Sequence, residues 1–419
     1  MAMYLTRLGW DVTVVTPDPS ILRNVEDIEK ASTEVDHAGI KRILTGHGWR
    51  CLAPNNLKCW NKNLGWFAGK VFRTGARKLG IDPHIGWIKA AEQACSALTA
   101  NDVDVILATG SPFAAFSLAK RLSERLGRPY VLDYRDPWTG NPHHGRLPSP
   151  AATQREADLL RGCAAVTIVS PSWGCALDRR FGVGPKLHVV TNGYDSGEMA
   201  AVKPYDFGHC AFVYTGIFYP PKRTISPFLA ALKLLKESLN GNGNGNGNDW
   251  YFHYYGVDEN YIRQEADRFE LSDRMVCHGR VPRGEALSAV KGARLALVIT
   301  SVAEEQTLED KGIVTGKIFE AIGLATPVLL IAPEGSDASA IAKPTGLVTS
   351  FAGTQIQGMV SFLKNVVYGQ APQHKNIESC SWTTISKDLD VLLRGVVCDG
   401  SHAHVGDRAS GWNALSTPR

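Results

Sequence analysis

The residues with the clearest chemical meaning open a predicted helix in the C-terminal half of the chain. Thr315 is a predicted N-cap, and Gly316 and Lys317 follow it, so unpaired backbone N–H groups and the positive end of the helix dipole point outward. Such an arrangement binds anions. Glu320 lies on the same face one turn later, and helical side chains lean toward the N-terminus, so its carboxylate can reach a bound ligand. An anion site beside a carboxylate suits a nucleoside diphosphate. Alternatively, Thr315 only caps the helix and Glu320 only complements its dipole.

A second group of candidate residues follows a strand predicted at Cys210–Thr215. Gly216 ends this strand, and the cations Lys222 and Arg223 come a few residues later. Glycine lets a ligand approach the backbone closely, and the two cations can neutralise phosphate charge. The pattern predicts a phosphate site; the alternative is a basic turn on the surface.

Three candidate strands in the N-terminal half each lead into a polar loop. They cover residues 103–109, 130–133 and 165–170, with Gly110 and Ser111 directly after the first. Helical segments between the strands predict βαβ units and a parallel sheet. Because ligands bind beyond the carboxyl ends of such strands, these loops are expected to line one crevice.

The loop after the second of these strands carries the most chemistry. Arg135 could contact phosphate or sugar oxygens, and Asp136 could orient an acceptor hydroxyl or accept its proton. An Arg–Asp pair that only braces the loop, with Trp138 packing beside it, explains the same residues at least as well.

Three segments resemble family-4-type glycosyltransferases with the GT-B fold. They are Gly127-Arg-Pro-Tyr-Val-Leu-Asp-Tyr-Arg-Asp-Pro-Trp138, the strand-and-glycine segment at 212–223, and the block at 315–330, which contains Gly316-Lys-Ile-Phe-Glu320. The resemblance implies an α/β protein made of two Rossmann-like, doubly wound domains that face a cleft. It also implies a retaining, metal-independent transfer of a sugar from a nucleoside diphosphate sugar, with no cofactor.

The resemblance also assigns roles to residues. The donor-side residues would be Gly216, Lys222, Arg223, Arg280, Val281, Thr315, Gly316, Lys317 and Glu320. The catalytic residues would be Asp136, Arg135 and Lys222, and the acceptor-side residues Gly110, Ser111 and Trp138. The glutamate at 320 would bind the donor ribose, while Lys222, Arg223 and the amides at 315–317 would stabilise the leaving diphosphate.

The chain departs from the family pattern in three places. Many members carry an earlier glutamate in the donor block, where this chain has Gly312; Glu309 and Asp310 are near that position in sequence only. Many members also have a histidine near the Arg135 position. The first strand and the glycine-rich loop expected before the helix at 2–8 are not present, which suggests that about one βα unit is missing upstream.

The expected organisation is an N-terminal domain at 1–196, a linker at 197–209 and a donor domain at 210–378. A helix at 379–396 would cross back to the N-terminal domain, and the tail at 397–419 is polar, without periodicity, and predicted to be disordered.

Composition limits the classes of function. The net charge of +4 and the lack of nucleic-acid-binding motifs argue against nucleic acid as a partner. The nine cysteines show no metal-ligand spacing, which favours free thiols in a reducing cytoplasm. No apolar run reaches the roughly 18 residues that span a bilayer, and no signal peptide opens the chain.

Residues 41–89 are basic and contain Trp49, Trp60, Trp66 and Trp87. This composition fits contact with an anionic membrane surface, and equally a solvated basic face with buried tryptophans. A membrane surface would agree with a lipid-linked acceptor.

The sequence therefore predicts a glycosyltransferase that acts on a glycan or lipid-linked acceptor in cell-surface polysaccharide synthesis, in the cytoplasm or at the inner face of the membrane. Two alternatives remain open: a GT-B sugar-nucleotide epimerase and a non-catalytic binding or subunit protein. A dinucleotide oxidoreductase is disfavoured, because no GxGxxG follows a strand.

Overall fold

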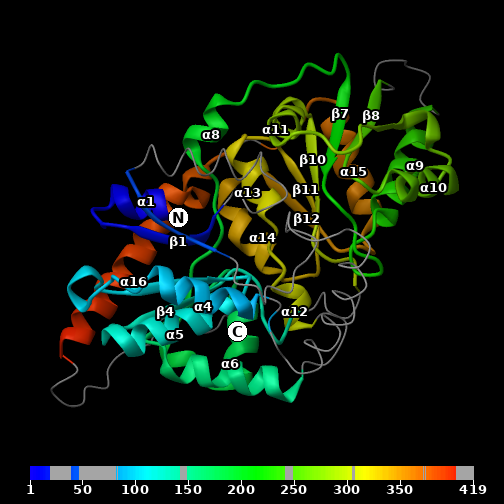
Figure 1. Ribbon diagram of the computed structural model, residues 1–419. Coiled ribbons are helices and arrows are strands. Elements are labelled where there is room, and N and C mark those ends of the chain that lie inside the picture. Colours follow the sequence, from blue (N-terminus) through cyan, green and yellow to red (C-terminus); the bar gives the residue numbers. More distant parts are fainter. Residues whose placement is uncertain are drawn as a thin grey trace, which may run out of the picture.

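The computed structural model describes residues 1–18, 39–46, 82, 84–141, 149–240, 249–303, 307–370, 372 and 374–402. These residues form two α/β domains, the first in blue to green and the second in green to orange (Figure 1). All the paired strands in their sheets run parallel.

The N-terminal domain contains a four-stranded sheet, in the order β3-β4-β5-β6, and a separate β1-β2 pair. Its strands are β1 Thr13–Pro17, β2 Lys41–Thr45, β3 Ile106–Gly110, β4 Tyr130–Tyr134, β5 Ala165–Ile168 and β6 Leu187–Val189. Its helices are α1 Ala2–Arg7, α4 Ile85–Ala94, α5 Ala114–Leu126, α6 Pro150–Gly162 and α7 Pro171–Phe181. Every residue of β4 and β5 is buried, which explains why these strands are mostly apolar and do not alternate with polar residues.

The C-terminal domain contains a six-stranded sheet in the order β12-β11-β10-β7-β8-β9. Its strands are β7 Cys210–Thr215, β8 Trp250–Tyr255, β9 Met275–Cys277, β10 Leu295–Ile299, β11 Val328–Ile331 and β12 Val348–Phe351. Its helices are α9 Ser226–Asn240, α10 Glu259–Arg268, α11 Arg283–Gly292, α12 Leu308–Lys311, α13 Gly316–Gly323, α14 Asp337–Ala342 and α15 Ile356–Val367. The strand order reverses between β7 and β10, and ligands of doubly wound sheets bind beside this switch point.

Both faces of this second sheet are covered by apolar cores. One core joins the sheet to α9 and α15, with Phe228 and Leu363 fully buried. The other joins it to α11, α13 and α14, with Ile318 and Phe319 fully buried. The predicted α/β class with two Rossmann-like domains is confirmed.

Two segments connect the domains. Helix α8, Ser196–Ala201, follows the N-terminal domain and places Met199 in the core of the C-terminal domain. Helix α16, Trp382–His402, runs back along the N-terminal domain beside α1 (Figure 1). The Trp10 indole N–H donates to Asp390 of α16 at 2.7 Å, and Leu389 is buried there.

Some expectations need correction or lie outside the described residues. Helix α16 continues to His402, so the start of the tail predicted to be disordered from Val397 is helical. The polar segment predicted after β10 contains α12, which was not expected. Most of the basic segment at 41–89 lies outside the described residues; within it, Trp87 is buried, and its indole N–H donates to the Thr45 hydroxyl at 2.6 Å. In the ranges that are described, no helix has the length and apolar character needed to cross a membrane.

Candidate functional site

A glycine follows each of three neighbouring strands of the C-terminal sheet: Gly216 after β7, Gly256 after β8 and Gly279 two residues after β9. We call the backbone at these three positions the glycine shelf. The Gly216 N–H donates to the Tyr255 carbonyl at 2.8 Å, and the Gly256 N–H donates to the Gly279 carbonyl at 2.9 Å. A Cβ atom on Gly256 would lie 2.1 Å from the Gly216 carbonyl oxygen, so no other residue fits there. Gly216 and Gly279 have φ angles of 137° and 71°, in a region that favours glycine. The sequence indicated Gly216 and the segment at 279, but not the glycine between them.

The N-terminus of α13 lies beside this shelf. The Thr315 hydroxyl accepts the Lys317 N–H at 3.4 Å, which confirms that Thr315 caps the helix. The Lys317 side chain crosses Gly216: a Cβ atom there would lie 2.6 Å from Lys317 Cε. Burial lowers the pKa of the Lys317 ammonium. Gly316, the first residue of the helix, is exposed.

A tight turn carries the two predicted phosphate-binding cations. The backbones of Tyr219 and Arg223 exchange hydrogen bonds of 3.0 and 2.9 Å, and the guanidinium of Arg223 lies over the Tyr219 ring at 5.2 Å. Among the described residues, the buried Nε of Arg223 has no hydrogen-bond partner. A buried donor without an acceptor is costly and calls for an explanation.

Lys222 forms an ion pair that the sequence did not predict. Its ammonium lies 2.8 Å from Oδ1 of Asp310, whose side chain is only 3% exposed. The Thr307 hydroxyl donates to the other oxygen of Asp310 at 2.7 Å. From the sequence, Asp310 was expected to be close to the donor block in position along the chain only. The spacing of Thr307 and Asp310, typical of a helix start, was the signal that could have placed this carboxylate.

The absence of a glutamate at position 312 has a structural cause. A Cβ atom on Gly312 would lie 2.1 Å from Cδ1 of Trp173, which belongs to the N-terminal domain. The Trp173 indole N–H donates to the Glu309 carbonyl at 2.8 Å, and the Ser170 hydroxyl donates to the Gly312 carbonyl at 2.8 Å. The indole therefore fills the space that a side chain at 312 would need.

A further contact between the domains lies nearby. The backbone N–H and the hydroxyl of Ser172 donate to the two oxygens of Asp337 at 2.7 and 2.8 Å. Burial raises the pKa of the Asp337 carboxyl.

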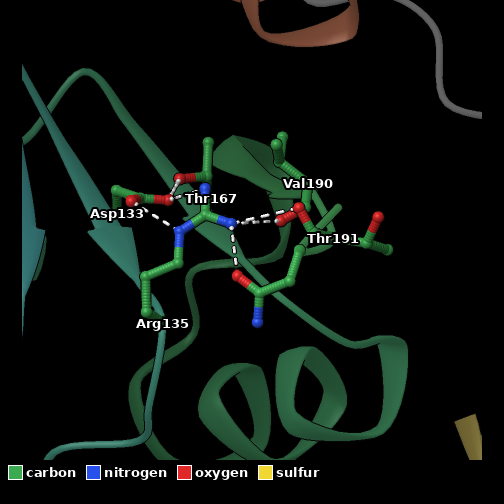
Figure 2. A network of polar contacts seen from close by, with 6 residues as sticks. Asp133, Arg135, Thr167, Val190 and Thr191 are labelled. Carbon is green, nitrogen blue, oxygen red and sulfur yellow. Dashed lines mark hydrogen bonds and ion pairs between the residues drawn. The ribbon is translucent and has the colours of Figure 1, made fainter. Parts of the chain in front are cut away.

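Arg135 is held in a buried network at the carboxyl end of β4 (Figure 2). Its Nε and Nη2 donate to the two carboxylate oxygens of Asp133 at 2.8 Å each. Its Nη1 donates to the Thr191 carbonyl at 3.0 Å and to the Asn192 side chain at 3.2 Å. The structure therefore favours the bracing role over the catalytic role for Arg135, and the partner is Asp133 rather than Asp136.

The other predicted acceptor-side residues differ in exposure. Asp136 and Ser111 are exposed. Trp138 stacks on Phe113, with ring centroids 5.1 Å apart and planes within 6°. A Cβ atom on Gly110 would lie 2.6 Å from the Phe113 ring, so the glycine permits this aromatic packing.

The remaining donor-side residues gather at α11 and α13. Arg280 is exposed and Val281 is partly buried, directly after Gly279. Glu320 has an ion-pair partner, because its carboxylate contacts the guanidinium of Arg283. The structure thus brings together the donor-side residues from β7, β9 and α13, while Arg135 belongs to a separate network.

Comparison with known proteins gives a family match and a common fold. Residues 1–198 match the family model Glycosyltransferase Family 4. No curated protein sequence matches this chain. Sucrose-phosphate synthase from Thermosynechococcus elongatus is similar in structure, with a TM-score of 0.54 at 13% identity over 96% of this chain and 90% of that chain.

Two further solved structures have the same fold. A glycosyltransferase from Rickettsia africae ESF-5 has a TM-score of 0.52 at 12% identity, over 94% of this chain and 93% of that chain. Anabaena Alr3699/HepE in complex with UDP has a TM-score of 0.50 at 14% identity, over 90% of this chain and 88% of that chain. The N-terminal half of the chain is thus similar to Glycosyltransferase Family 4, and the predicted GT-B fold is confirmed.

Proposed function

We propose that this chain, a family-4-type glycosyltransferase by its N-terminal sequence and its fold, transfers a sugar from a nucleoside diphosphate sugar to a glycan or lipid-linked acceptor. One observation carries the proposal: the glycine shelf, the start of α13, Lys317 and Arg223 lie together. Lys317 crosses Gly216, and the charge of Arg223 contributes to lowering the Lys317 pKa, although burial is the larger cause.

This arrangement suits a diphosphate. The amides at the start of α13 and the unpartnered Nε of Arg223 provide donors, and Lys317 provides positive charge. Transfer requires stabilisation of the negative charge that develops on the leaving diphosphate, and donors fixed in advance supply it without reorganisation. Lys222 takes part from its position on the turn, where Asp310 fixes its ammonium.

The acceptor side rests on fewer observations. Asp136 is exposed in the loop after β4, and we propose it as the residue that orients the acceptor hydroxyl. We infer from the family resemblance that transfer retains stereochemistry, needs no metal or other cofactor and serves cell-surface polysaccharide synthesis at the cytoplasmic face of the membrane.

A non-catalytic binding or subunit protein is the second candidate, and the contacts of Trp173 favour it. The indole fills the space beside Gly312, where many family members carry a carboxylate. In that case the chain would bind nucleotide or glycan without turnover.

Thermal unfolding of the purified chain with UDP, GDP or ADP tests whether the chain binds a nucleotide. A nucleotide at about 100 times its dissociation constant adds roughly 2.7 kcal/mol to the free energy of unfolding. UDP is the first to test, because the structure of Anabaena Alr3699/HepE contains it. Arg223→Ala should lose the shift, whereas Arg268→Ala, on the exposed side of α10, should keep it.

Turnover then separates the two candidates. With the nucleotide identified, release of that nucleoside diphosphate from its sugar conjugates in the presence of acceptor supports the transferase. Binding without turnover supports the non-catalytic protein. If no nucleotide shifts the unfolding of the folded chain, the transferase is wrong, and a non-catalytic protein that binds glycan remains.

A further inference from the structure

Glu320 belongs to a network of three charged side chains, each from a different helix. The guanidinium of Arg283 donates through Nε and Nη2 to the two oxygens of Glu198, at 3.0 Å each. Its remaining nitrogen, Nη1, donates to Oε1 of Glu320. Hydrogen bonding to Glu198 and Glu320 raises the pKa of the Arg283 guanidinium, against the effect of burial. A two-pronged contact of this kind fixes orientation as well as charge.

Glu198, the member of this network that lies away from Glu320, is held in place by several contacts. Glu198 lies in the first turn of α8, where its backbone N–H donates to the capping Asp195 carboxylate at 2.7 Å. Helix α8 is attached to the C-terminal domain by Met199, which is buried in the core, and by the Lys291 ammonium, which donates to the Met199 carbonyl at 3.2 Å. Glu198 therefore anchors Arg283, and Arg283 in turn fixes Glu320.

The three charged side chains lie at the protein surface and not inside a core. The side chains of Arg283, Glu198 and Glu320 are 46%, 32% and 25% exposed. The contact with Arg283 uses Oε1 of Glu320, and no hydrogen bond from the described residues reaches Oε2. This oxygen is an oriented acceptor one helical turn from the amides proposed to hold the diphosphate.

We propose that Arg283 is a positioning residue that orients Glu320 toward the ribose of the donor, and so makes the site selective for ribonucleotides over 2′-deoxyribonucleotides. The inference rests on the function proposed above. The two adjacent hydroxyls of a ribose can both donate to an oriented carboxylate, whereas a 2′-deoxyribose has lost one of these donors. A site built to bind a hydroxyl discriminates against the analogue that lacks it, because its own polar group then stays unpaired.

Nucleotide titration by calorimetry tests this role on the full chain. The probes are UDP with 2′-deoxy-UDP, and the corresponding ADP and GDP pairs. Because Glu320 is partly exposed, we expect the wild-type chain to bind the ribonucleotide about tenfold more tightly, at the low end for a hydrogen bond to a charged group. In Arg283→Ala this ratio should fall toward one, while affinity for the deoxy compound changes little. Arg283→Lys should restore only part of the ratio.

Two further variants test whether the effect on the ratio comes from the contact between Arg283 and Glu320. Glu198→Gln weakens the anchor of Arg283 without touching Glu320, so it should lower the same ratio by a smaller factor. Arg268→Ala is the matched control, since Arg268 pairs with Glu265 on α10, is 70% exposed and should leave the ratio unchanged. Unfolding of each variant confirms that it is folded at the titration temperature.

The outcomes separate this inference from the proposed function. A wild-type ratio that persists in Arg283→Ala overturns the positioning role and leaves nucleotide binding intact. Tighter binding of both nucleotides by Arg283→Ala also overturns it, because Arg283 would then be blocking the site. If the wild-type chain binds no nucleotide at all, the proposed function and the inference both fail.

Discussion

Replacing Arg135 with alanine should destabilise the N-terminal domain severely, and the cost can be argued from the network in Figure 2. Asp133 has a side chain that is 1% exposed, and Arg135 is its counter-ion. Without the guanidinium, the hydrogen bond that the described residues still give this carboxylate comes from the Thr167 hydroxyl at 2.6 Å, and the buried N-terminal ammonium of Met1 remains nearby. The carbonyl of Thr191 and the side chain of Asn192 also lose their donor.

The expected magnitude follows from these contacts. Removing one partner of a buried ion pair costs about 3–5 kcal/mol. Each hydrogen bond lost to a buried acceptor adds about 1 kcal/mol, although the terms do not simply add. Against a total stability of about 5–15 kcal/mol, Arg135→Ala removes a large fraction. Arg135→Lys should cost roughly 2 kcal/mol, because an ammonium cannot form the two-pronged contact and also reach the carbonyls.

Urea unfolding measures the stability, with Arg128→Ala as the matched control. Arg128 lies in the same segment, but its exposed guanidinium donates to the Ala100 carbonyl alone, so its loss should cost under about 1 kcal/mol. The double variant Asp133→Asn with Arg135→Met should be more stable than the sum of the single costs predicts, by about 1–3 kcal/mol.

Activity per folded molecule completes the test. If Arg135 only braces the loop, Arg135→Lys should retain near-normal turnover at a temperature where it is folded. A stability change below about 1 kcal/mol in Arg135→Ala, together with a loss of turnover of about a hundredfold or more in Arg135→Lys, would refute the bracing role and restore the catalytic one.

Two other features give direct tests. Gly312→Ala should destabilise the chain by about 1–3 kcal/mol in urea unfolding, because the new methyl overlaps the Trp173 ring. Gly312→Ala should cost less in a Trp173→Leu background than in the wild type, while Gly284→Ala, where a new methyl meets no atom within 4 Å, should cost little; equal costs at the two glycines would contradict the steric argument. Burial, and then two neighbouring histidines, lower the pKa of His253 to about 4, so the unfolded chain takes up this proton first as the pH falls. Stability should therefore decrease between about pH 6.5 and 4 by up to about 3 kcal/mol, and His253→Gln should show a flatter profile in unfolding measured across that window; identical profiles would rule out this assignment.

The start of α13 could be predicted because its signals are local. A capping threonine, accessible amides and a carboxylate one turn later all lie within six residues, and helical geometry alone fixes their relation. The strands were found for a similar reason. A strand buried on both faces is mostly apolar, as β10 is throughout and β4 is apart from Asp133, so composition reveals it without any knowledge of its neighbours.

Side-chain partners far apart in sequence could not be predicted in this way. Lys222 and Asp310 are 88 positions apart, and Trp173 meets the segment that contains Gly312 from the other domain. Sequence reasoning assigned Arg135 to catalysis or to a pair with Asp136, whereas the carboxylate that binds it is Asp133.

The sequence by itself therefore determined the class of fold, the start of helix α13 and the glycine after β7, since each depends on the conformational preferences of neighbouring residues. Only the tertiary structure decided which carboxylate fixes Lys222, why a glycine stands at 312, and that Arg283 connects Glu198 to Glu320. A carboxylate or guanidinium carries no local preference for its partner. Its pairing is set by the packing of whole helices and strands, which brings distant charges into contact.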